Sequence, residues 1–407
     1  MSRASVCRIC DGTVQEFFDF GYGPLANAFL APGQRDGYRF HLAIGACQSC
    51  QMVQLSDLAP PDRMFHHSYP YRSSESASMR AHFHGIAQEL LRTKLTGPDP
   101  FIVELGSNDG IMLRWIAERG IRHLGVEPCG DVAQVGRANE IRVRNEFFDE
   151  GLGAEILAED GPADVIFGAN TVSHICDIAS VFRGAEKLLA PEGLFIFEDP
   201  YFGSIIDRTS FDQIYDEHVF FFTATSVRAM ARRHGFDLVD VVLPPVHGGA
   251  IRCTLARPGT HPVTPAVERL LAEEEARKLT EPETLRGFAE GVDRVRDDLV
   301  GLLRELTAAG KRVVGYGATA KSTTLLNYCG IGPDLVEFIC DSTTSKQGKL
   351  TPGTHIEVRE PAAFRHPYPD YALLLAWNHG EEIMRKESGF RAAGGKWIHY
   401  VPEVRVA

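Results

Sequence analysis

Residues 101–110 read FIVELGSNDG, and residues 124–128 read LGVEP. The first stretch is an apolar run that enters a glycine-containing turn. The second is a short apolar run that ends in a carboxylate, Glu127. Further strand-like runs alternate with helical segments up to about residue 200. This alternation predicts a doubly wound α/β fold with a parallel sheet, in which ligands bind at the carboxyl ends of the strands.

The hydrophobic pattern extends this core into a middle domain that we place at 76–258. A stripe of apolar side chains at helical spacing predicts a helix over 76–95: Met79, Phe83, Ile86 and Leu90. Strands are expected at 101–105, 123–127, 163–170 and 193–200, with helices between them that include 111–120 and 178–190. Two late strands, 236–245 and 250–258, follow a helix at 224–235.

The remaining third of the chain predicts a second α/β domain at 259–407. Residues 259–285 are charged and punctuated by proline, so we interpret them as a linker into a long amphipathic helix that ends near residue 310. Strands at 312–318, 335–341 and 371–377 and a helix at 321–329 follow. The first 75 residues contain only short apolar runs, which is too little core for independent stability without a staple.

Composition limits the classes of function. The formal net charge of −12 disfavours nucleic acid as a partner, because such binding needs clustered Lys and Arg. The chain has no apolar run that would span a bilayer and no apolar stretch of a secretory signal at its start, so we expect a cytoplasmic protein without a membrane partner. Nine cysteines in such a chain do not predict a disulfide framework.

Four of these cysteines form two pairs with metal-ligand spacing. Cys7 and Cys10 make one C-x2-C knuckle, and Cys47 and Cys50 make another after a gap of 36 residues. Two such knuckles complete a tetrahedral zinc shell, which would be structural because no ligand position is left open. The alternative is four reduced, buried cysteines; the need for a staple favours zinc.

The turn after the strand at 101–105 predicts a site for a methyl donor. Gly106 permits close backbone approach of a nucleotide, and Glu127 lies where a carboxylate can accept both ribose hydroxyls. A lone glycine-rich turn is a weak signal, but the second strand end supports S-adenosylmethionine (SAM), and the absence of G-x-G-x-x-G here disfavours NAD. The predicted cofactor-binding residues are Glu104, Gly106, Asn108, Asp109, Glu127 and Asn170.

The tetrad Tyr215-Asp216-Glu217-His218 predicts a proton-transfer site. His218 has the intrinsic pKa of a general base, Glu217 could orient it, and Tyr215 could bond a substrate oxygen. Adjacent residues of an extended segment point in opposite directions, so Glu217 and His218 need a turn to converge. His174 at the end of the fourth strand is a further catalytic candidate.

Other residues are candidates for holding the substrate. His247 lies in VHGG, whose glycines allow close approach of a ligand. Tyr69 and Tyr71 lie in an aromatic segment that either contacts the substrate or simply packs on the zinc module.

A second nucleotide-like turn, GYGATAKS, occupies residues 315–322. It fits a G-x-G-x-x-A phosphate turn between strand and helix, and it also differs from a P-loop only by Ala320 in place of glycine. Backbone amides at the helix start and the charge of Lys321 favour phosphate in either case, so we prefer a nucleotide-sugar diphosphate over a merely solvated turn. The predicted substrate-binding residues here are Tyr316, Lys321, Ser322, Asp341, Lys346 and Asn378.

Taken together, the chain resembles the SAM-dependent C-methyltransferases that act on nucleotide-linked 4-keto-deoxysugars in antibiotic pathways. The segments that carry the resemblance are the four cysteines, SYPYRSS, ELGSNDG, GVEP, YDEH, VHGG, GYGATAKSTTLLNY and KQGKLTPGTHI. The order of the late strands also resembles the antiparallel finish of a SAM-dependent methyltransferase. The resemblance implies a zinc-binding domain at 1–75, a Rossmann-like SAM domain at 76–258 and a Rossmann-like nucleotide-sugar domain at 259–407.

The resemblance also implies roles for the candidate residues. His218 would remove the C3 proton of a dTDP-linked keto-sugar, and Tyr215, Glu217, His174 and Tyr69 would line the reacting sugar. Separately from the resemblance, we expect a monomer. The sequence leaves C3 and C5 methylation open. An NAD(P)-dependent nucleotide-sugar oxidoreductase and a non-catalytic binder recruited through the zinc module remain alternatives.

Overall fold

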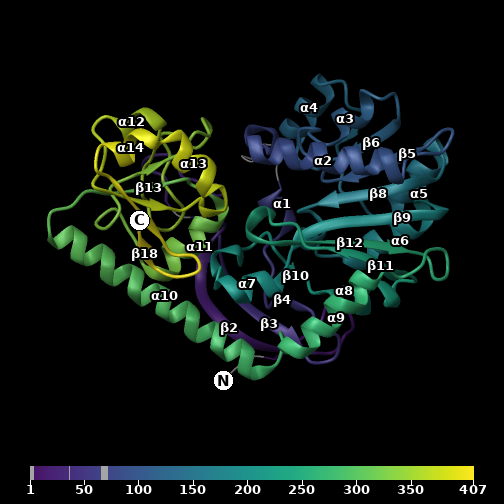
Figure 1. The fold of residues 1–407 in the computed structure, drawn as a ribbon, viewed down its shortest axis with the longest axis horizontal. Helices are drawn as coiled ribbons and strands as arrows, with labels where there is room; N and C mark the ends of the chain where they lie inside the picture. Colours follow the sequence, from purple (N-terminus) through teal and green to yellow (C-terminus); the bar gives the residue numbers. More distant parts are fainter. Residues whose placement is uncertain (1–3, 36, 66–71) are drawn as a thin grey trace.

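The computed structural model describes residues 4–35, 37–65 and 72–407, which form three sheets with their helices (Figure 1). The first sheet is antiparallel, in the order β1-β2-β3-β4-β10. Its strands are β1 (Ala4–Val6), β2 (Thr13–Pro24), β3 (Arg39–Cys47), β4 (Val53–Leu55) and β10 (Phe220–Phe221). The short helix α1 (Pro61–Met64) follows β4. Because β10 comes from far along the chain, this sheet is not built by the N-terminal segment alone.

The second sheet has seven strands in the order β11-β12-β9-β8-β5-β6-β7. Its parallel part consists of β5 (Phe101–Leu105), β6 (Arg122–Val126), β7 (Val143–Arg144), β8 (Ala163–Ala169) and β9 (Leu189–Pro200). The two predicted late strands are β11 (Asp237–Val242) and β12 (Ala250–Ala256), and they add to the sheet antiparallel, as the resemblance to SAM-dependent methyltransferases implied. The doubly wound sheet with an antiparallel finish is therefore confirmed.

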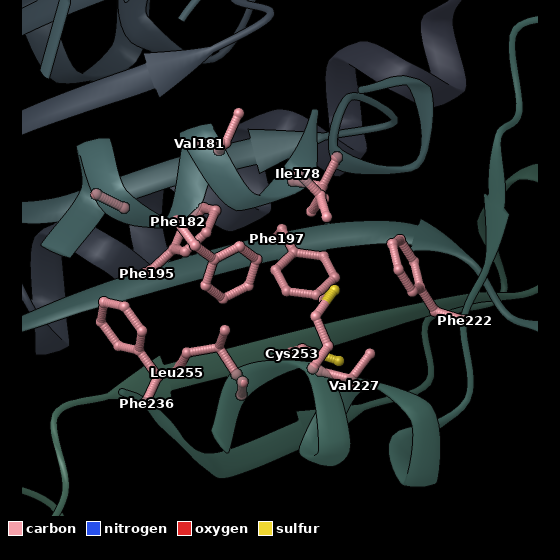
Figure 2. Close-up of a cluster of buried hydrophobic side chains, with 14 of the residues drawn as sticks. Ile178, Val181, Phe182, Phe195, Phe197, Phe222, Val227, Phe236, Cys253 and Leu255 are labelled. Carbon is pink, nitrogen blue, oxygen red and sulfur yellow. The ribbon is translucent and has the colours of Figure 1, made fainter. Parts of the chain in front are cut away.

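Helices cover both faces of this sheet, because alternate residues of each strand point to opposite sides. Ile102 belongs to one core, with α2 (Ala77–Thr93), α3 (Leu113–Ala117) and α4 (Gly130–Ala138). Its neighbours Phe101 and Val103 belong to the other, with α5 (Glu150–Asp160), α6 (Ile178–Leu188) and α8 (Ala224–Arg233). Figure 2 shows this second core, in which the phenylalanine rings of β9 fill the space toward α6 and α8. The predicted stripe of α2 is buried as expected.

The segment 259–285 is not the linker that its composition suggested. Residues Pro265–Arg277 form helix α9, which packs on the second core through Val267, Leu270 and Leu271. The fourth residue of this stripe, Glu274, is buried because its carboxylate accepts hydrogen bonds from the backbone N–H groups of Ala224 and Thr225 at the start of α8. The apolar spacing of i, i+3 and i+4 was present in the sequence, but the surrounding charges obscured it.

The third sheet is formed by the C-terminal part of the chain, in the order β15-β14-β13-β16-β17-β18. The first five strands pair in parallel, and β18 is antiparallel to β17. Its strands are β13 (Val313–Tyr316), β14 (Ile339–Cys340), β15 (Val358–Arg359), β16 (Tyr371–Leu374), β17 (Lys396–His399) and β18 (Arg405–Val406). The remaining α-helices of the described residues are α7 (Phe202–Arg208), α10 (Pro282–Ala308), α11 (Ala320–Cys329), α12 (Pro361–Arg365), α13 (Gly380–Lys386) and α14 (Ser388–Ala392).

The N-terminal sheet and the C-terminal part share one apolar core. Phe18, Phe40 and Ile44 of the first sheet pack in the same cluster as Leu285 and Phe288 of α10. In Figure 1 the long helix α10 runs from the end of the N-terminal sheet along the C-terminal part. The N-terminal segment is thus stabilised by burial against its neighbours. Within the described residues, no helix is both long and apolar enough to cross a bilayer.

Candidate active site

One cavity of about 810 Å³ lies where the three sheets meet. It is lined by the strand ends of the second sheet, by the turn that contains Tyr215 and His218, and by the turn that precedes α11. The predicted methyl-donor site, the predicted base and the predicted phosphate turn are therefore parts of one continuous space. The site residues that line it are Gly106, Asn108, Glu127, Asn170, His174, Tyr215, Glu217, His218, His247, Tyr316, Lys321, Asp341, Lys346 and Asn378.

At the strand ends of the second sheet, Glu127 is held rigidly. Its Oε2 accepts from the backbone N–H of Asn108 at 2.9 Å, and its Oε1 accepts from that of Cys129 at 2.8 Å. Burial raises the pKa of this carboxyl above its usual value. Each oxygen retains further acceptor capacity, so a pair of ribose hydroxyls can bind here. The residues therefore fit the nucleoside part of SAM.

Two asparagines shape the same rim. Asn108 and Asn170 both adopt the left-handed conformation, with φ of 49° and 50°, which asparagine tolerates better than most residues. Asn108 Oδ1 accepts from the backbone N–H of Ser73 at 2.9 Å, which holds the segment before α2 against this rim. The backbone N–H of Asn170 donates to Glu198 O at 2.7 Å.

The predicted role of Gly106 in SAM binding can be tested by substitution, because the space around this residue excludes a side chain. Its φ is +64°, and an added Cβ would lie 2.2 Å from Thr171 Oγ1. We expect Gly106→Ala to lower SAM affinity more than about tenfold, because Thr171 would be pushed into the cavity that it lines. Gly120→Ala is the matched control: its φ is +70° and nothing lies within 4 Å of an added Cβ. Calorimetry should find unchanged SAM affinity in the control, and equal affinities in both variants would contradict the placement.

The tetrad forms the tight turn that convergence of Glu217 and His218 requires. The backbone N–H of His218 donates to Tyr215 O at 3.0 Å, so Tyr215, Glu217 and His218 all face the cavity. The turn is held on both sides. Leu55 of β4 donates to Val219 O at 2.9 Å, and Thr324 Oγ1 of α11 donates to Ile214 O at 2.7 Å.

The hydrogen bonds of His218 define its tautomer. Its Nδ1 lies 2.8 Å from Gln213 O, a carbonyl that can only accept, so Nδ1 carries the hydrogen. The Nε2 lone pair is then the basic site, and the Tyr215 hydroxyl, 2.8 Å away, donates to it. Burial, followed by the neighbouring His174, lowers the pKa of His218 well below its usual value. The imidazole is therefore neutral at neutral pH, with its lone pair on Nε2.

His174 is placed beside this pair. Its ring stacks on Phe65, and its centroid lies 5.0 Å from that of His218. Its Nε2 is buried without a hydrogen-bond partner among the described residues, so it is available to a ligand in the cavity. Burial lowers the pKa of His174 to about 4.

The depressed pKa of His174 predicts a dependence of stability on pH. Between about pH 6.5 and 4, the unfolded chain takes up a proton at this residue that the folded chain does not, so the free energy of unfolding should fall as pH falls. Replacement by asparagine should remove this contribution, which is at most about 1.4 kcal/mol per pH unit. Urea unfolding of His174→Asn and of a His123→Asn control across this range measures the difference. If the free energy of unfolding changes with pH equally in His174→Asn and in the unmodified protein, the prediction is wrong.

On the C-terminal side, cations surround the start of α11. Lys321 Nζ donates to His247 O at 3.2 Å and lies 5.3 Å from the centroid of the Trp377 ring. Burial lowers the pKa of Lys321 to about 8, and the charge of Asp212 acts in the opposite direction. Lys346 Nζ donates to Ala318 O at 2.8 Å. Two cations beside a helix N-terminus suit a ligand with phosphate groups.

His247 and Asn378 line the same side of the cavity. His247 has a φ of 52° within its glycine-rich turn, and its Nε2 is buried without a partner among the described residues. Burial lowers its pKa well below the usual value. A neutral imidazole nitrogen of this kind can bond to a ligand that enters the cavity.

Several candidates have structural contacts instead of a free approach to the cavity. Glu104 and Asp109 are buried beneath the first strand end and do not line the cavity, although Asp109 Oδ2 accepts from Ser74 N at 3.1 Å. Ser322 donates to Thr319 O at 2.6 Å within the first turn of α11 and does not line it either. The Tyr316 hydroxyl points to Glu387, at 2.8 Å.

The other candidates are accounted for by loop contacts or fall outside the described chain. Asp341 lines the cavity but holds its own loop, because its carboxylate accepts from Ala318 N and Thr343 N. Tyr69 and Tyr71 lie outside the described residues.

Sequence reasoning missed Asn27, which lines the cavity from the N-terminal segment. Its Nδ2 donates to Glu217 Oε1 at 2.6 Å. It also missed Phe147, an exposed aromatic at the rim near the predicted ribose site. No spacing rule links Asn27 to residues 190 positions away, so no signal in one sequence could have found it.

The four cysteines of the N-terminal knuckles are clustered. Their sulfur atoms all lie within 4.8 Å of one another, and two of the separations are 3.6 and 3.5 Å. A zinc ion with Zn–S bonds of about 2.3 Å needs sulfurs about 3.8 Å apart. The backbone N–H groups of Ile9 and Ser49 donate to Cys7 Sγ and Cys47 Sγ, which favours thiolates. The four cysteine sulfurs therefore fit the ligand set of a structural zinc ion.

Family models match three successive parts of the chain. A zinc binding domain matches residues 7–65, a methyltransferase domain matches residues 79–241, and a C-methyltransferase C-terminal domain matches residues 245–402. With the cavity and the cysteine cluster, these matches define the class of protein: a SAM-dependent methyltransferase with a zinc-binding N-terminal domain.

The C-methyltransferase NovU of Streptomyces niveus is 36% identical over 406 residues, which cover 98% of this chain and 96% of NovU. The chain belongs to the same family of C-methyltransferases. The ubiquinone biosynthesis O-methyltransferase of Methylobacterium sp. (strain 4-46) is 27% identical over 159 residues, 38% of this chain and 58% of that protein. A solved structure of magnesium protoporphyrin IX methyltransferase (ChlM) from Synechocystis PCC 6803 with bound SAM aligns with a TM-score of 0.34 and 9% identity, over 44% of this chain and 79% of that one.

Proposed function

We propose that this C-methyltransferase transfers the methyl group to C3 of a dTDP-linked 4-keto-deoxysugar. The observation that supports this most is the single cavity that joins Glu127, His218 and Lys321. A nucleotide-sugar with its diphosphate near Lys321 would extend its sugar toward the tetrad. The methyl donor would occupy the strand ends around Glu127.

In this proposal His218 is the base. The neighbouring ketone acidifies the C3 proton, and His218 Nε2 takes that proton while the electron pair moves to form an enolate. Gly106, Asn108, Glu127 and Asn170 would hold SAM, whose sulfonium provides the methyl group when it is bound. The enolate carbon would form its new bond to that methyl carbon as the sulfur–methyl bond breaks, and the electron pair of the broken bond would stay on sulfur, so that S-adenosylhomocysteine leaves. The low pKa of His218 keeps it unprotonated in the empty site, and the negative charge of a bound diphosphate and enolate would raise its proton affinity.

The Tyr215 hydroxyl explains how the base becomes available. It occupies the Nε2 lone pair at 2.8 Å, so a substrate must displace it before His218 can act. Once displaced, the hydroxyl can donate to the keto oxygen, and His174 Nε2 can supply a second donor. Hydrogen bonds aimed at the developing oxyanion stabilise the enolate.

Lys321, Lys346, His247 and Asn378 would hold the nucleotide-sugar. The position of Lys321 beside the start of α11 and of Lys346 behind Ala318 suits two phosphate groups. Holding the sugar against the methyl donor in one cavity lowers the barrier through proximity.

The test is incubation of the zinc-loaded enzyme with labelled SAM and a panel of dTDP-4-keto sugars, with mass spectrometry and NMR to locate the added carbon. A methyl group at C3 supports the proposal. A methyl group at C5 would refute the proposed position of methylation but would leave the proposed substrate class standing. Reduction of a keto-sugar by NAD(P)H without methylation would refute the proposal.

A further inference from the structure

The segment 25–30 of the N-terminal part carries an inference that goes beyond these roles. It lies between the tetrad and α11 and bonds to both. The backbone N–H of Ala26 donates to Asp216 Oδ1 at 2.8 Å, and Ala26 O accepts from Thr323 Oγ1 at 2.8 Å. Leu30 pairs with Leu350 through two backbone hydrogen bonds of 2.9 and 2.8 Å. The segment is thus fixed at both ends against the C-terminal part.

Asn27 is the residue of this segment that enters the cavity. Its amide donates to Glu217 Oε1 at 2.6 Å, a short hydrogen bond to a side chain that is only 2% exposed. A carboxylate that accepts such a bond is favoured in its ionised form and loses rotational freedom. The preceding residue, Ala26, holds Asp216 in the same way, so one segment holds both adjacent carboxyl groups.

Glu217 lies between the two ligand regions of the cavity. Among the described residues, Glu217 interacts electrostatically with Asp216 on its own turn, Lys346 on the C-terminal side and Cys129 at the start of α4, and it shares the cavity with Tyr215 and His218 of its own turn. Its charge contributes to raising the pKa of Asp216 and of the Cys129 thiol, and it opposes the lowering of the pKa of Lys346 by burial. A rotation of Glu217 would therefore change the charge at the junction of the donor and acceptor ligands.

We propose that Asn27 is a positioning residue of the methyl-transfer site, which holds Glu217 ionised and oriented toward the reacting sugar. The inference rests on the proposed function for the role of Glu217. It gives the N-terminal domain a part in turnover in addition to its zinc site. Asn27 acts through Glu217 and not on the reacting atoms.

The test compares three variants of the zinc-loaded enzyme. Asn27→Ala removes the donor and should lower kcat about tenfold or more, with SAM affinity and the thermal midpoint close to those of the unmodified enzyme. Asn27→Asp keeps the shape but replaces the donor with a second carboxylate. It should lower kcat further and move the acid limb of the kcat profile to higher pH, because a like charge raises the pKa of Glu217. Ala28→Asp adds a charge to the exposed side of the same segment and should leave kcat and its pH profile unchanged.

Two results would overturn the inference. One is an Asn27→Ala enzyme whose kcat stays within a factor of two of the unmodified enzyme. The other is an Asn27→Asp enzyme with an unshifted pH profile. If the unmodified enzyme methylates none of the keto-sugars, the proposed substrate fails separately, and a crystal structure of Asn27→Ala decides the inference: Glu217 should leave its present rotamer, and an unchanged rotamer would refute the positioning role.

Discussion

Replacing His218 with alanine is expected to reduce methyl transfer by about 10³-fold or more, the range that a positioned general base contributes. The reason is that Nε2 is the basic atom of a neutral imidazole whose other nitrogen is committed to Gln213 O at 2.8 Å. SAM affinity should stay within about a factor of two, because the residues around Glu127 do not depend on His218. Single-turnover kinetics with labelled SAM and calorimetry measure the two quantities separately.

Because His218 is buried, the alanine variant needs two companions. His218→Asn retains a donor for Gln213 O but has no basic nitrogen, so it should be as inactive as alanine while folding better. His123→Ala removes a histidine from the strand end away from the cavity and should keep full activity. Near-full activity of either His218 variant would refute its role as the base.

Loss of the zinc site should be the most damaging change to the fold. Cys47→Ser removes one of four clustered thiolates, and we expect zinc content to fall well below one ion per chain. The free energy of unfolding should drop by more than about 4 kcal/mol, as for other losses of a structural metal. Turnover should fall with it, because the first sheet includes β10, which directly follows the tetrad. Metal analysis, thermal unfolding and activity on one preparation measure these effects.

The matched control for this variant lies within the same knuckle. Gln48 is exposed between the two cysteines, so Gln48→Ala keeps all four thiolates and should retain zinc, stability and activity. A Cys47→Ser protein that unfolds at the same temperature as this control would show that zinc does not stabilise the domain.

The architecture was predictable from the sequence where its period was strong. The parallel strands and the stripe of α2 followed from local pattern, whereas the antiparallel finish was implied only by the resemblance to SAM-dependent methyltransferases. The helix α9 did not, because its apolar face is narrow and one position of it is filled by Glu274, a charge that is buried only because it caps α8. A charged residue with a buried partner elsewhere in the chain cannot be distinguished from a solvated one by composition.

The candidate site, like the fold, was predictable from the sequence only where a local motif marked it. Motifs at strand ends placed Glu127 and Lys321 at the cavity, since strand ends converge in any such sheet. They did not distinguish Glu104 and Asp109, which lie one layer below the surface of the cavity, from the residues that line it. Asn27 and the pairing of β10 with β4 depend on contacts between distant parts of the chain, which no local pattern encodes.

The two-residue strand β10 has a consequence for how this enzyme can be divided. Its pairing with β4 attaches the turn that contains the tetrad to the N-terminal sheet. The next residue, Phe222, lies in the core of the second sheet, where its ring centroid is 5.4 Å from that of Phe197 (Figure 2). A truncated fragment that begins after the N-terminal sheet would lack β4, so β10 would lose its pairing partner. A chimera that exchanges domains between relatives to change substrate choice would therefore have to take both β4 and β10 from the same relative.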